Sequence, residues 1–318
     1  MYYIQSSAYI SHQDTFRKKG FSKNLSENIS TLIRPDYKEF INPALIRRMS
    51  EVLRMSVACG SAALQDAGVN TADAIIAGTG LGCLMDTEKF LNNVITIQGG
   101  MLPPTSFIQS THNTIAGQLS LALSCHSYNM THTQNSLSFE YALSDTMLML
   151  DEQQGNILAG AADEYIDPLQ PVANYFGLNR FPLTSGAGFF VLSDKASAHT
   201  QAVLADVLAI HYSDENVCKD FLERNHLTSP DFILTDGYHD DTKRIAQNFS
   251  ETPVILYTPL CGVYATSSAF AMHLAIDILQ QKTGQVSGTA IRQHRHALII
   301  NQLLPGHTGL ILIKNYEA

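Results

Sequence analysis

Hydrophobic positions in the middle of the chain switch between helical and strand-like spacing. Apolar residues recur near helical spacing over 114–123 and again over 138–150. Two short segments, 128–133 and 156–160, are predicted to be strands, the first of them buried. The pattern therefore predicts the order helix, strand, helix, strand across this stretch.

The first hundred residues carry the same kinds of signal. Residues 1–10 predict a strand, and 11–37 are polar and irregular, which indicates a surface excursion. A strong apolar repeat over 44–66 predicts one long helix, with Pro43 in its first turn and Gly68 just past its end. A buried strand over 72–78 and a helix over 85–96 follow.

Beyond residue 160 the alternation continues. Residues 166–182 indicate a loop-rich connection. Further strands are predicted at 184–192, 202–211, 232–235, 254–257, 297–300 and 309–313, and helices at 216–225, 240–248 and 265–281. Alternating strands and helices imply a layered α/β fold with largely parallel central strands. We expect two halves, 1–195 and 196–318, within one compact unit.

The turn at 133–138 is where chemistry should be sought. A strand that runs into a buried helix displays side chains at the helix N-terminus, where unpaired N–H groups stabilise negative charge. Nucleophiles are often placed at such turns. Here the turn reads Thr-Gln-Asn-Ser-Leu-Ser and holds no cysteine.

Two motifs flank this turn, Phe107-Ile-Gln-Ser-Thr-His-Asn113 and Ser138-Phe-Glu-x-Ala-Leu143. Through them the chain resembles the β-ketoacyl synthases of the thiolase-like superfamily. It is most similar to the small chain-length-factor-like proteins of aryl-polyene and flexirubin pathways. The resemblance implies the duplicated α-β-α-β-α sandwich of the thiolase-like fold, into which the two predicted halves fit.

The resemblance also locates the residues that would correspond to the catalytic ones. Counting back from Gly160 puts the nucleophile position at Asn135 or Ser136, whereas counting back from Glu140 puts it nearer His132. Gln134 lies in the same window, and glutamine in that place is a mark of chain-length factors.

The positions of the two family histidines are also altered. They fall at or near His239 and at Val263, and the closing glycine-rich loop is reduced to residues 301–309. A decarboxylating condensation needs a thiolate and two donors for the enolate oxygen. The resemblance therefore implies a catalytically silent relative.

Such a relative would act as a chain-length factor in a heterodimer with an active β-ketoacyl synthase. The partner would supply the cysteine and histidines and receive acyl groups from an acyl carrier protein. Strand 128–133 would extend the sheet across the interface. The residues implied at the acyl tunnel or the interface are Phe107, Ile108, Gln109, His112, Asn113 and Thr133.

Two other interpretations remain open. Ser136 could be the nucleophile of a stand-alone acyltransferase or hydrolase, with His132 or His239 as its base. As a structural residue, Ser136 would instead cap the following helix. The chain could also be a homodimeric acyl-binding protein without a catalytic partner.

Composition excludes several other classes. The net charge is −9, the pI is about 5.7 and no Lys/Arg run occurs, which argues against nucleic-acid binding. The five cysteines are scattered and form no CxxC motif, so we expect a reduced, cytoplasmic setting. No signal peptide and no stretch of 18 apolar residues is evident.

No cofactor or metal is expected. The glycines 78, 80 and 82 lack the GxGxxG spacing of a dinucleotide loop and predict a tight strand-to-helix turn. The twelve histidines show no HExxH or Cys/His pair. Asp163 and Glu164 are expected to cap a turn, and Cys261 to be a buried thiol.

Overall fold

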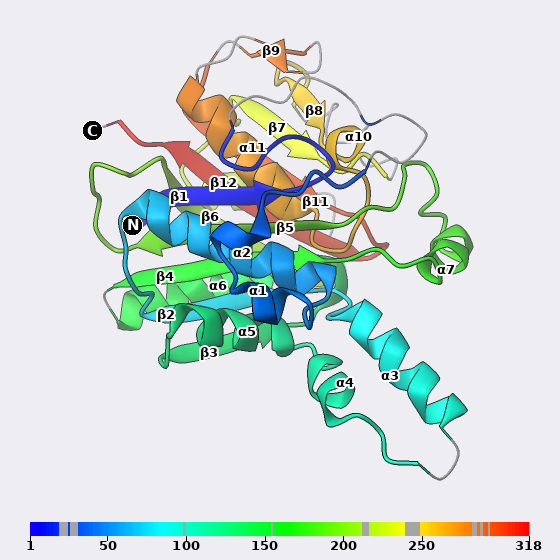
Figure 1. Cartoon of the computed structure of the whole chain (residues 1–318). Coiled ribbons are helices and arrows are strands. Elements are labelled where there is room, and N and C mark those ends of the chain that lie inside the picture. Colours follow the sequence, from blue (N-terminus) through cyan, green and yellow to red (C-terminus); the bar gives the residue numbers. More distant parts are fainter. Residues whose placement is uncertain are drawn as a thin grey trace.

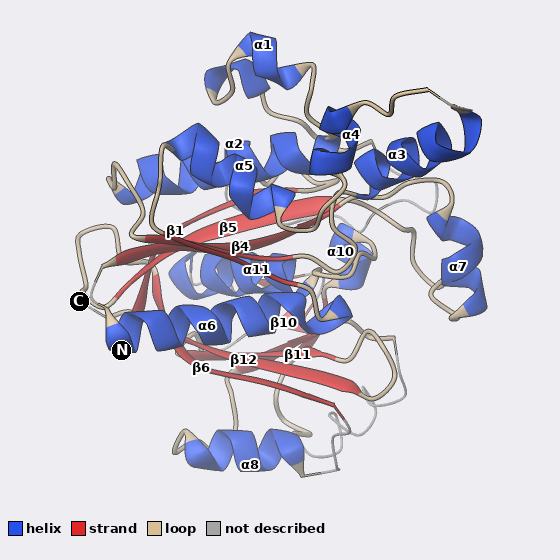
Figure 2. Cartoon of the chain, turned by 90° about the horizontal axis from the view of Figure 1, so that it is seen from below, coloured by secondary structure: helices blue, strands red, loops and turns tan. Residues whose placement is uncertain are grey.

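The computed structural model describes residues 1–18, 25, 31–97, 100–153, 155–211, 216–238, 249–281, 285–286, 289–291 and 293–317. Ten strands form one sheet, in which two groups of five face each other across a central helical layer (Figures 1 and 2). Helices α2 (Glu51–Ala67) and α5 (Thr114–Leu123) cover one outer face, and α8 (Val217–Arg224) covers the other. Helices α6 (Ser138–Glu152) and α11 (Ser268–Gln281) fill the middle layer.

The sheet contains the same strand order twice. The first five strands lie in the order β3-β2-β4-β5-β1, and the second five in the order β6-β12-β11-β7-β8. When the strands of each half are numbered separately, both groups read 3-2-4-5-1 from the outer end of the sheet toward its centre. The strands are β1 (Tyr2–Ile10), β2 (Ala74–Gly78), β3 (Tyr128–His132), β4 (Asn156–Asp163), β5 (Gly186–Ser193), β6 (Ala202–His211), β7 (Phe232–Thr235), β8 (Val254–Leu256), β11 (His296–Asn301) and β12 (His307–Asn315).

The predicted division at 195/196 falls between β5 and β6 and stays a prediction. The two groups meet through β1 and β6, which pair antiparallel over residues 2–4 and 202–204. A separate small sheet consists of β9 (Gln285–Val286) and β10 (Thr289–Ala290).

The expectation of parallel central strands is wrong for the centre of the sheet. Strands β4, β5, β1, β6, β12 and β11 pair antiparallel in succession. Parallel pairing is found at the two ends, where β2 lies between β3 and β4 and where β7 lies between β11 and β8. Helices cross over between the parallel strands, whereas β4 and β5 are joined by a connection that returns antiparallel.

Apolar burial follows these layers. One cluster joins the facing sheets to α6 and α11, including Phe139, Phe190 and Phe270. A second lies between the first sheet and α2 and α5, and a third beneath α8. The apolar period that predicts α11 is thus the period of a core helix, buried on nearly all sides.

Two elements differ from the sequence prediction. The segment predicted as one helix over 44–66 forms two helices, α1 (Pro43–Ile46) and α2, with residues 47–50 between them. Leu45, on α1, is half exposed. The connection 166–182 contains a helix, α7 (Leu169–Tyr175). The helix predicted over 240–248 lies outside the described residues. The remaining helices are α3 (Leu84–Thr96), α4 (Pro104–Gln109), α10 (Thr258–Cys261) and the short 3-10 turns η1 (Tyr37–Glu39) and η2 (Asn135–Leu137).

Candidate functional site

A sharp turn joins the end of β3 to the start of α6. Asn135 adopts a left-handed backbone with φ of 51°, a conformation that asparagine tolerates better than most side chains. The Ser138 hydroxyl accepts a hydrogen bond from the Gln134 N–H at 2.9 Å and donates to the Asn135 carbonyl at 2.7 Å. The turn is therefore fixed from within.

Close packing holds this turn against the end of β2. A Cβ on Gly78 would lie 2.5 Å from the Ser138 carbonyl oxygen, so only glycine allows the α6 N-terminus to approach so closely. The next residues, 79–82, turn sharply at the edge of the sheet, as the glycine spacing predicts. The structure thus brings the loops after β2 and β3 together.

Ser136 lies at the centre of this arrangement and is fully buried. Its Oγ is 3.2 Å from Nδ1 of His307, at the start of β12. Burial, with a smaller contribution from His211, lowers the pKa of His307, so its imidazole is neutral at neutral pH. A neutral imidazole can accept the hydroxyl proton of Ser136 in a hydrogen bond.

Behind Ser136, the end of β11 connects the turn to a buried acid. Nδ2 of Asn301 donates to the Ser136 carbonyl at 2.7 Å and to Oε1 of Glu140 at 2.8 Å. Glu140 is fully buried. Burial raises the pKa of Glu140 to about 7, although the bond from Asn301 partly offsets this. Gly309 passes directly over the carboxyl group.

Of the two histidines considered as bases for Ser136, the structure describes His132, which binds elsewhere. Nε2 of His132 lies 2.9 Å from Oδ2 of Asp145, and Tyr128 donates to the same carboxylate oxygen, so His132 is bound to α6 instead. His239 lies outside the described residues. The idea that Ser136 caps α6 is wrong, because Ser136 sits inside η2 and Leu137 is the capping residue.

The position expected for the second histidine holds an apolar side chain in a fixed turn. Val263 is buried, and its N–H donates to the Pro182 carbonyl at 2.9 Å. Gly262 before it has φ of 78°, and a Cβ there would collide with Thr184. The side chain at this position is therefore apolar and cannot donate a hydrogen bond to a group beside the turn.

An apolar cavity of about 190 Å³ lies against Asn135 and Ser136. Its wall is almost entirely carbon and comes from α7, from the turns at 182–184 and 263–265 and from the 303–304 segment. The principal apolar contacts are Leu81, Leu169, Val172, Phe176, Leu183, Val263 and Leu303. None of the five cysteines lines it.

Asp163 also lines the cavity, and both of its carboxylate oxygens accept hydrogen bonds. It accepts from Thr79 and from the N–H groups of residues 80 and 81, and also from both the N–H and hydroxyl of Thr266. This one carboxylate joins the loop after β2 to the segment before α11. As expected, it caps a turn.

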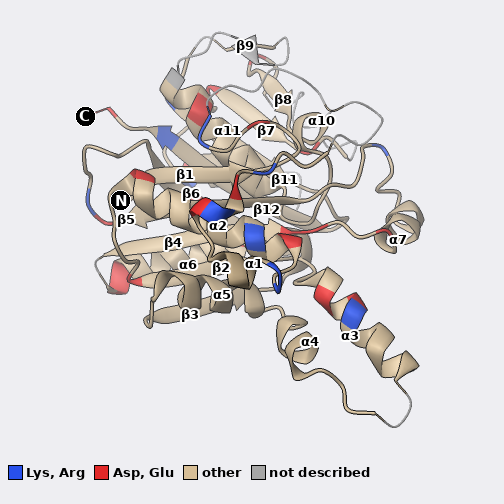
Figure 3. Cartoon of the chain, viewed as in Figure 1, with Lys and Arg blue, Asp and Glu red and all other residues tan. Residues whose placement is uncertain are grey.

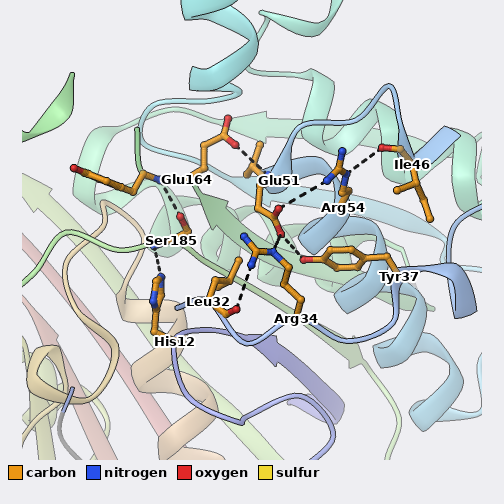
Figure 4. A network of polar contacts seen from close by, with 11 residues as sticks. His12, Leu32, Arg34, Tyr37, Ile46, Glu51, Arg54, Glu164 and Ser185 are labelled. Atoms are coloured by element: carbon orange, nitrogen blue, oxygen red, sulfur yellow. Dashed lines mark hydrogen bonds and ion pairs between the residues drawn. The ribbon is translucent and has the colours of Figure 1, made fainter. Parts of the chain in front are cut away.

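Glu164 caps two helices at once. Its carboxylate accepts from the N–H of Val52 at 3.2 Å and from the N–H of Met85 at 2.9 Å, near the starts of α2 and α3. Burial raises the pKa of Glu164 to about 7, which these two bonds partly offset. Figure 4 shows it beside Glu51, whose own carboxylate binds Arg34.

The residues expected at a tunnel or interface lie together on the outside of the molecule, and none of them lines the cavity. Phe107 and Ile108 on α4 are 58% and 62% exposed, and the Phe107 ring packs on Phe90 of α3. Asn113 accepts a hydrogen bond from Thr131 of β3. Gln109 donates a hydrogen bond to the Arg48 carbonyl, and His112 packs over Gly82. Thr133 is exposed.

None of the five cysteines forms a disulfide, and Cys59, Cys83, Cys125 and Cys261 are buried. Cys261 is buried as expected, and burial raises the pKa of its thiol, which disfavours the reactive thiolate. Among the residues the structure describes, no group of three or more His, Cys, Asp or Glu side chains could hold a metal ion. No helix in the described part of the chain has the length and apolar character to cross a bilayer.

Comparison with known proteins gives the family. The model of the β-ketoacyl synthase N-terminal domain matches residues 25–211, which is more than half of the chain. The chain belongs to the β-ketoacyl synthase family. No curated protein sequence matches it significantly.

Solved structures of this family share the fold over nearly the whole chain. The ishigamide ketosynthase/chain length factor matches with a TM-score of 0.80 at 15% identity, covering 99% of both chains. The ketosynthase ApeO in complex with its chain length factor ApeC, from Xenorhabdus doucetiae, gives 0.75 at 11% identity, covering 99% of this chain and 98% of that one. A β-ketoacyl synthase from Burkholderia phymatum STM815 gives 0.79 at 13%, with 99% of both chains covered. These similarities confirm the thiolase-like fold.

Sequence reasoning did not find His307 or Asn301 as neighbours of the turn. Both lie in the 301–309 segment, which is recognisable as the shortened closing loop. The position of this loop in the family pattern could have indicated that both residues lie near the turn. The sequence does not indicate that His307 contacts Ser136, because the two are 171 residues apart.

Proposed function

We propose that this chain is a non-catalytic, chain-length-factor-type subunit that pairs with an active β-ketoacyl synthase. The observation that carries the proposal is a fully built turn between β3 and α6 that contains no thiol. Asn135 and Ser136 occupy it, and Val263 faces the adjacent cavity with carbon. The family's condensation needs a thiolate and two donors, and none of these described residues provides them.

A partner is supported by an exposed face without charges. No Asp, Glu, Lys or Arg occurs between Lys89 and Glu140. Figure 3 accordingly shows no charged residue on β3, α4 or α5. Large apolar side chains are exposed along this stretch, which we call the uncharged face: Leu91, Val94, Ile95, Met101, Phe107, Ile108, Leu121, Tyr128 and Met130.

The position of β3 favours a partner of the same fold. β3 is one of the two edge strands of the sheet, and among the described residues it pairs only with β2. An unpaired strand edge beside exposed apolar side chains is a template for another chain. A synthase of this family could place its own edge strand there and continue the sheet.

In this arrangement the partner supplies the chemistry, and α3 and α4 project toward it from the body of the fold (Figure 1). Phe107, Ile108, Gln109 and His112 would line or gate the partner's acyl tunnel, with Asn113 and Thr133 at the interface. The acyl carrier protein would load the partner, and the product would be a polyketide of the aryl-polyene type. We propose a cytoplasmic setting for the pair.

Co-expression with the β-ketoacyl synthase encoded beside this chain tests the proposal. We expect a stable heterodimer that condenses malonyl-loaded carrier protein only when both chains are present. Ile108→Asp should abolish co-purification because it places a charge in an apolar interface. Lys219→Asp, on α8 at the far side of the molecule, is the matched control and should leave pairing intact. Condensation by the synthase at the same rate without this chain would refute the role.

A second function is favoured by the Ser136–His307 contact. A hydroxyl within 3.2 Å of a neutral imidazole, beside an apolar cavity, has the nucleophile-and-base arrangement of an acyltransferase. An acyltransferase role predicts that the purified chain alone accepts an acyl group from a thioester, so that its measured mass increases by the mass of that group. Ser136→Ala should abolish that gain, whereas Ser144→Ala on α6 should not. A homodimeric acyl-binding protein would instead form stable dimers without covalent labelling.

A further inference from the structure

An open hollow of about 730 Å³ lies where β1, β6 and β11 begin and β12 ends. Residues 1–3, 203–205, 295–296 and 314–317 line it, and we call it the terminal hollow. Figure 1 shows this end of the sheet on the opposite side of the molecule from α3 and α4. The terminal hollow shares no residue with the cavity beside the β3–α6 turn or with the uncharged face, so it is independent of both.

One row of side chains crosses the four strands of the terminal hollow. Tyr3 of β1 pairs with Val203 of β6, which pairs on its other side with Lys314 of β12. Lys314 pairs in turn with His296 of β11. Residues that are directly opposite each other in antiparallel strands point to the same face of the sheet. All four are half-buried, so the row forms a floor that is open to solvent.

This row continues a face that α8 covers elsewhere. Leu312 and Leu298 lie two residues beyond Lys314 and His296 on the same strands, and they pack in the apolar cluster beneath α8. α8 has eight residues, whereas α2, on the outer face of the first half, has 17. No residue of α8 lines the terminal hollow. The short helix therefore leaves this end of the sheet accessible to a ligand.

Two cations of the terminal hollow lack a carboxylate partner. Within the described part of the chain, the Lys314 side chain makes no hydrogen bond and no ion pair. Arg295 also lines the hollow, and its Nη2 donates to the neutral amide oxygen of Gln293 at 2.9 Å. Burial, with smaller contributions from Lys314 and Arg295, lowers the pKa of His296. The two positive charges are therefore close together and not neutralised.

The acidic side chains nearby do not cancel these charges. One carboxylate lines the terminal hollow, that of Glu317, which is exposed. Asp231 raises the pKa of His296 but does not line the hollow, and its Oδ2 accepts the N–H groups of Arg295 and His296. With His296 neutral, two cations and one carboxylate give the lining side chains a charge of +1, in a chain of net charge −9. This local charge favours an anion.

Most of the exposed wall around these charges is carbon. The rings of Tyr3 and Tyr316 pack edge to face, with their centroids 5.8 Å apart. Aromatic rings pack favourably against other rings. Sites for small molecules measure about 300–1,000 Å³ and combine apolar walls with a few polar groups. The terminal hollow thus fits a small ligand with an aromatic body and one anionic group.

We propose that the terminal hollow binds a small aromatic anion. The carboxylate or phosphate group of this ligand pairs with Lys314 and Arg295. Its ring packs against Tyr3 and Tyr316. The proposal does not rest on the chain-length-factor role, because the terminal hollow lies away from the uncharged face and from the β3–α6 turn. Failure of one therefore leaves the other standing.

Calorimetric titration of the full-length chain at neutral pH tests this, in complex with its synthase where co-expression yields the complex. Phenyl phosphate and benzoate are the probes, while inorganic phosphate lacks the ring and benzyl alcohol lacks the charge. At least one probe should bind saturably, and at least about ten-fold more tightly than inorganic phosphate and benzyl alcohol. The tighter probe identifies the anionic group. No saturable binding of either probe, or equal binding of benzyl alcohol, would refute the proposal.

Variants locate the site. Lys314→Gln and Arg295→Gln each remove one cation and should weaken binding of the tighter probe at least about five-fold. Glu317→Gln removes a like charge and should strengthen it. Lys219→Gln, on α8 outside the hollow, is the matched control and should have no effect. Circular dichroism confirms that each variant is folded. Unchanged affinity in folded Lys314→Gln, weaker binding in Glu317→Gln, or an equal loss in Lys219→Gln would overturn the assignment.

Discussion

Replacing Glu140 by glutamine should change how stability depends on pH. The carboxyl group has an ordinary pKa of 4.5, and burial raises it to about 7 in the folded protein. Between these values the folded state holds a proton that the unfolded chain releases. Stability from this group is therefore greatest at low pH and falls as the pH rises through 4.5 to 7.

The difference between the two pKa values gives the size of the effect. A shift from 4.5 to about 7 corresponds to about 3 kcal/mol of stability lost at pH 8.5 relative to pH 4.5. Glutamine has nearly the same shape, keeps the acceptor for Asn301 and does not ionise. Glu140→Gln should therefore lose about 3 kcal/mol less than the wild type over that interval.

Urea unfolding at one fixed protein concentration, at several pH values from 4.5 to 8.5, measures this. Glu164 has a raised pKa of the same kind and stays in both proteins, so the difference between the two curves isolates Glu140. Glu152→Gln, at the exposed end of α6, controls for the loss of one surface charge. Parallel curves for the wild type and Glu140→Gln would show that the buried acid is not held neutral.

Three further perturbations test other parts of the structure. Gly309→Ala puts a methyl group 2.6 Å from Glu140 Oε1 and should lower the free energy of unfolding by about 1–3 kcal/mol. Gly117→Ala is the control, because a methyl group there has nothing within 4 Å and should not lower stability. Equal urea midpoints for the two variants would contradict this. Asp163→Asn turns an acceptor toward Thr266 into a donor and should cost about 3 kcal/mol, measured the same way; a loss below about 1 kcal/mol would contradict the clamp. Phe107→Ala should lengthen the products of the synthase pair, read by mass spectrometry; unchanged product length would remove Phe107 from the tunnel.

Local pattern predicted most helices and strands because their burial is regular. The apolar period of α11 and the strand run 156–160 each correspond to a buried element. The segment 128–133 also forms a strand, β3, but the expectation that it is buried is wrong, because β3 lies at the edge of the sheet and none of its residues is buried. The break between α1 and α2 could not be predicted, because the apolar spacing continues through it. The start of α2 depends on Glu164, which accepts from Val52 across 112 residues.

The location of the candidate site could be predicted from the sequence, but the contacts between its residues could not. The turn at 133–138 follows from a strand that leads into a helix, and its lack of cysteine is evident from the sequence. The pairing of Ser136 with His307 spans 171 residues and is set by how β12 meets α6. The assignment of the nucleophile position within 132–136 stays a prediction.

The hydrogen bonds that Thr266 donates to Asp163 affect how the chain folds during synthesis. They connect residues 103 positions apart, and β1 must also wait for β5 and β6 before it is paired on both sides. Contacts of such long range form late, because the loops between them must close first. The first half therefore leaves the ribosome with its central carboxylate still lacking Thr266 and with the uncharged face already exposed. In that interval, protection from aggregation has to come from chaperones or from early assembly with the partner.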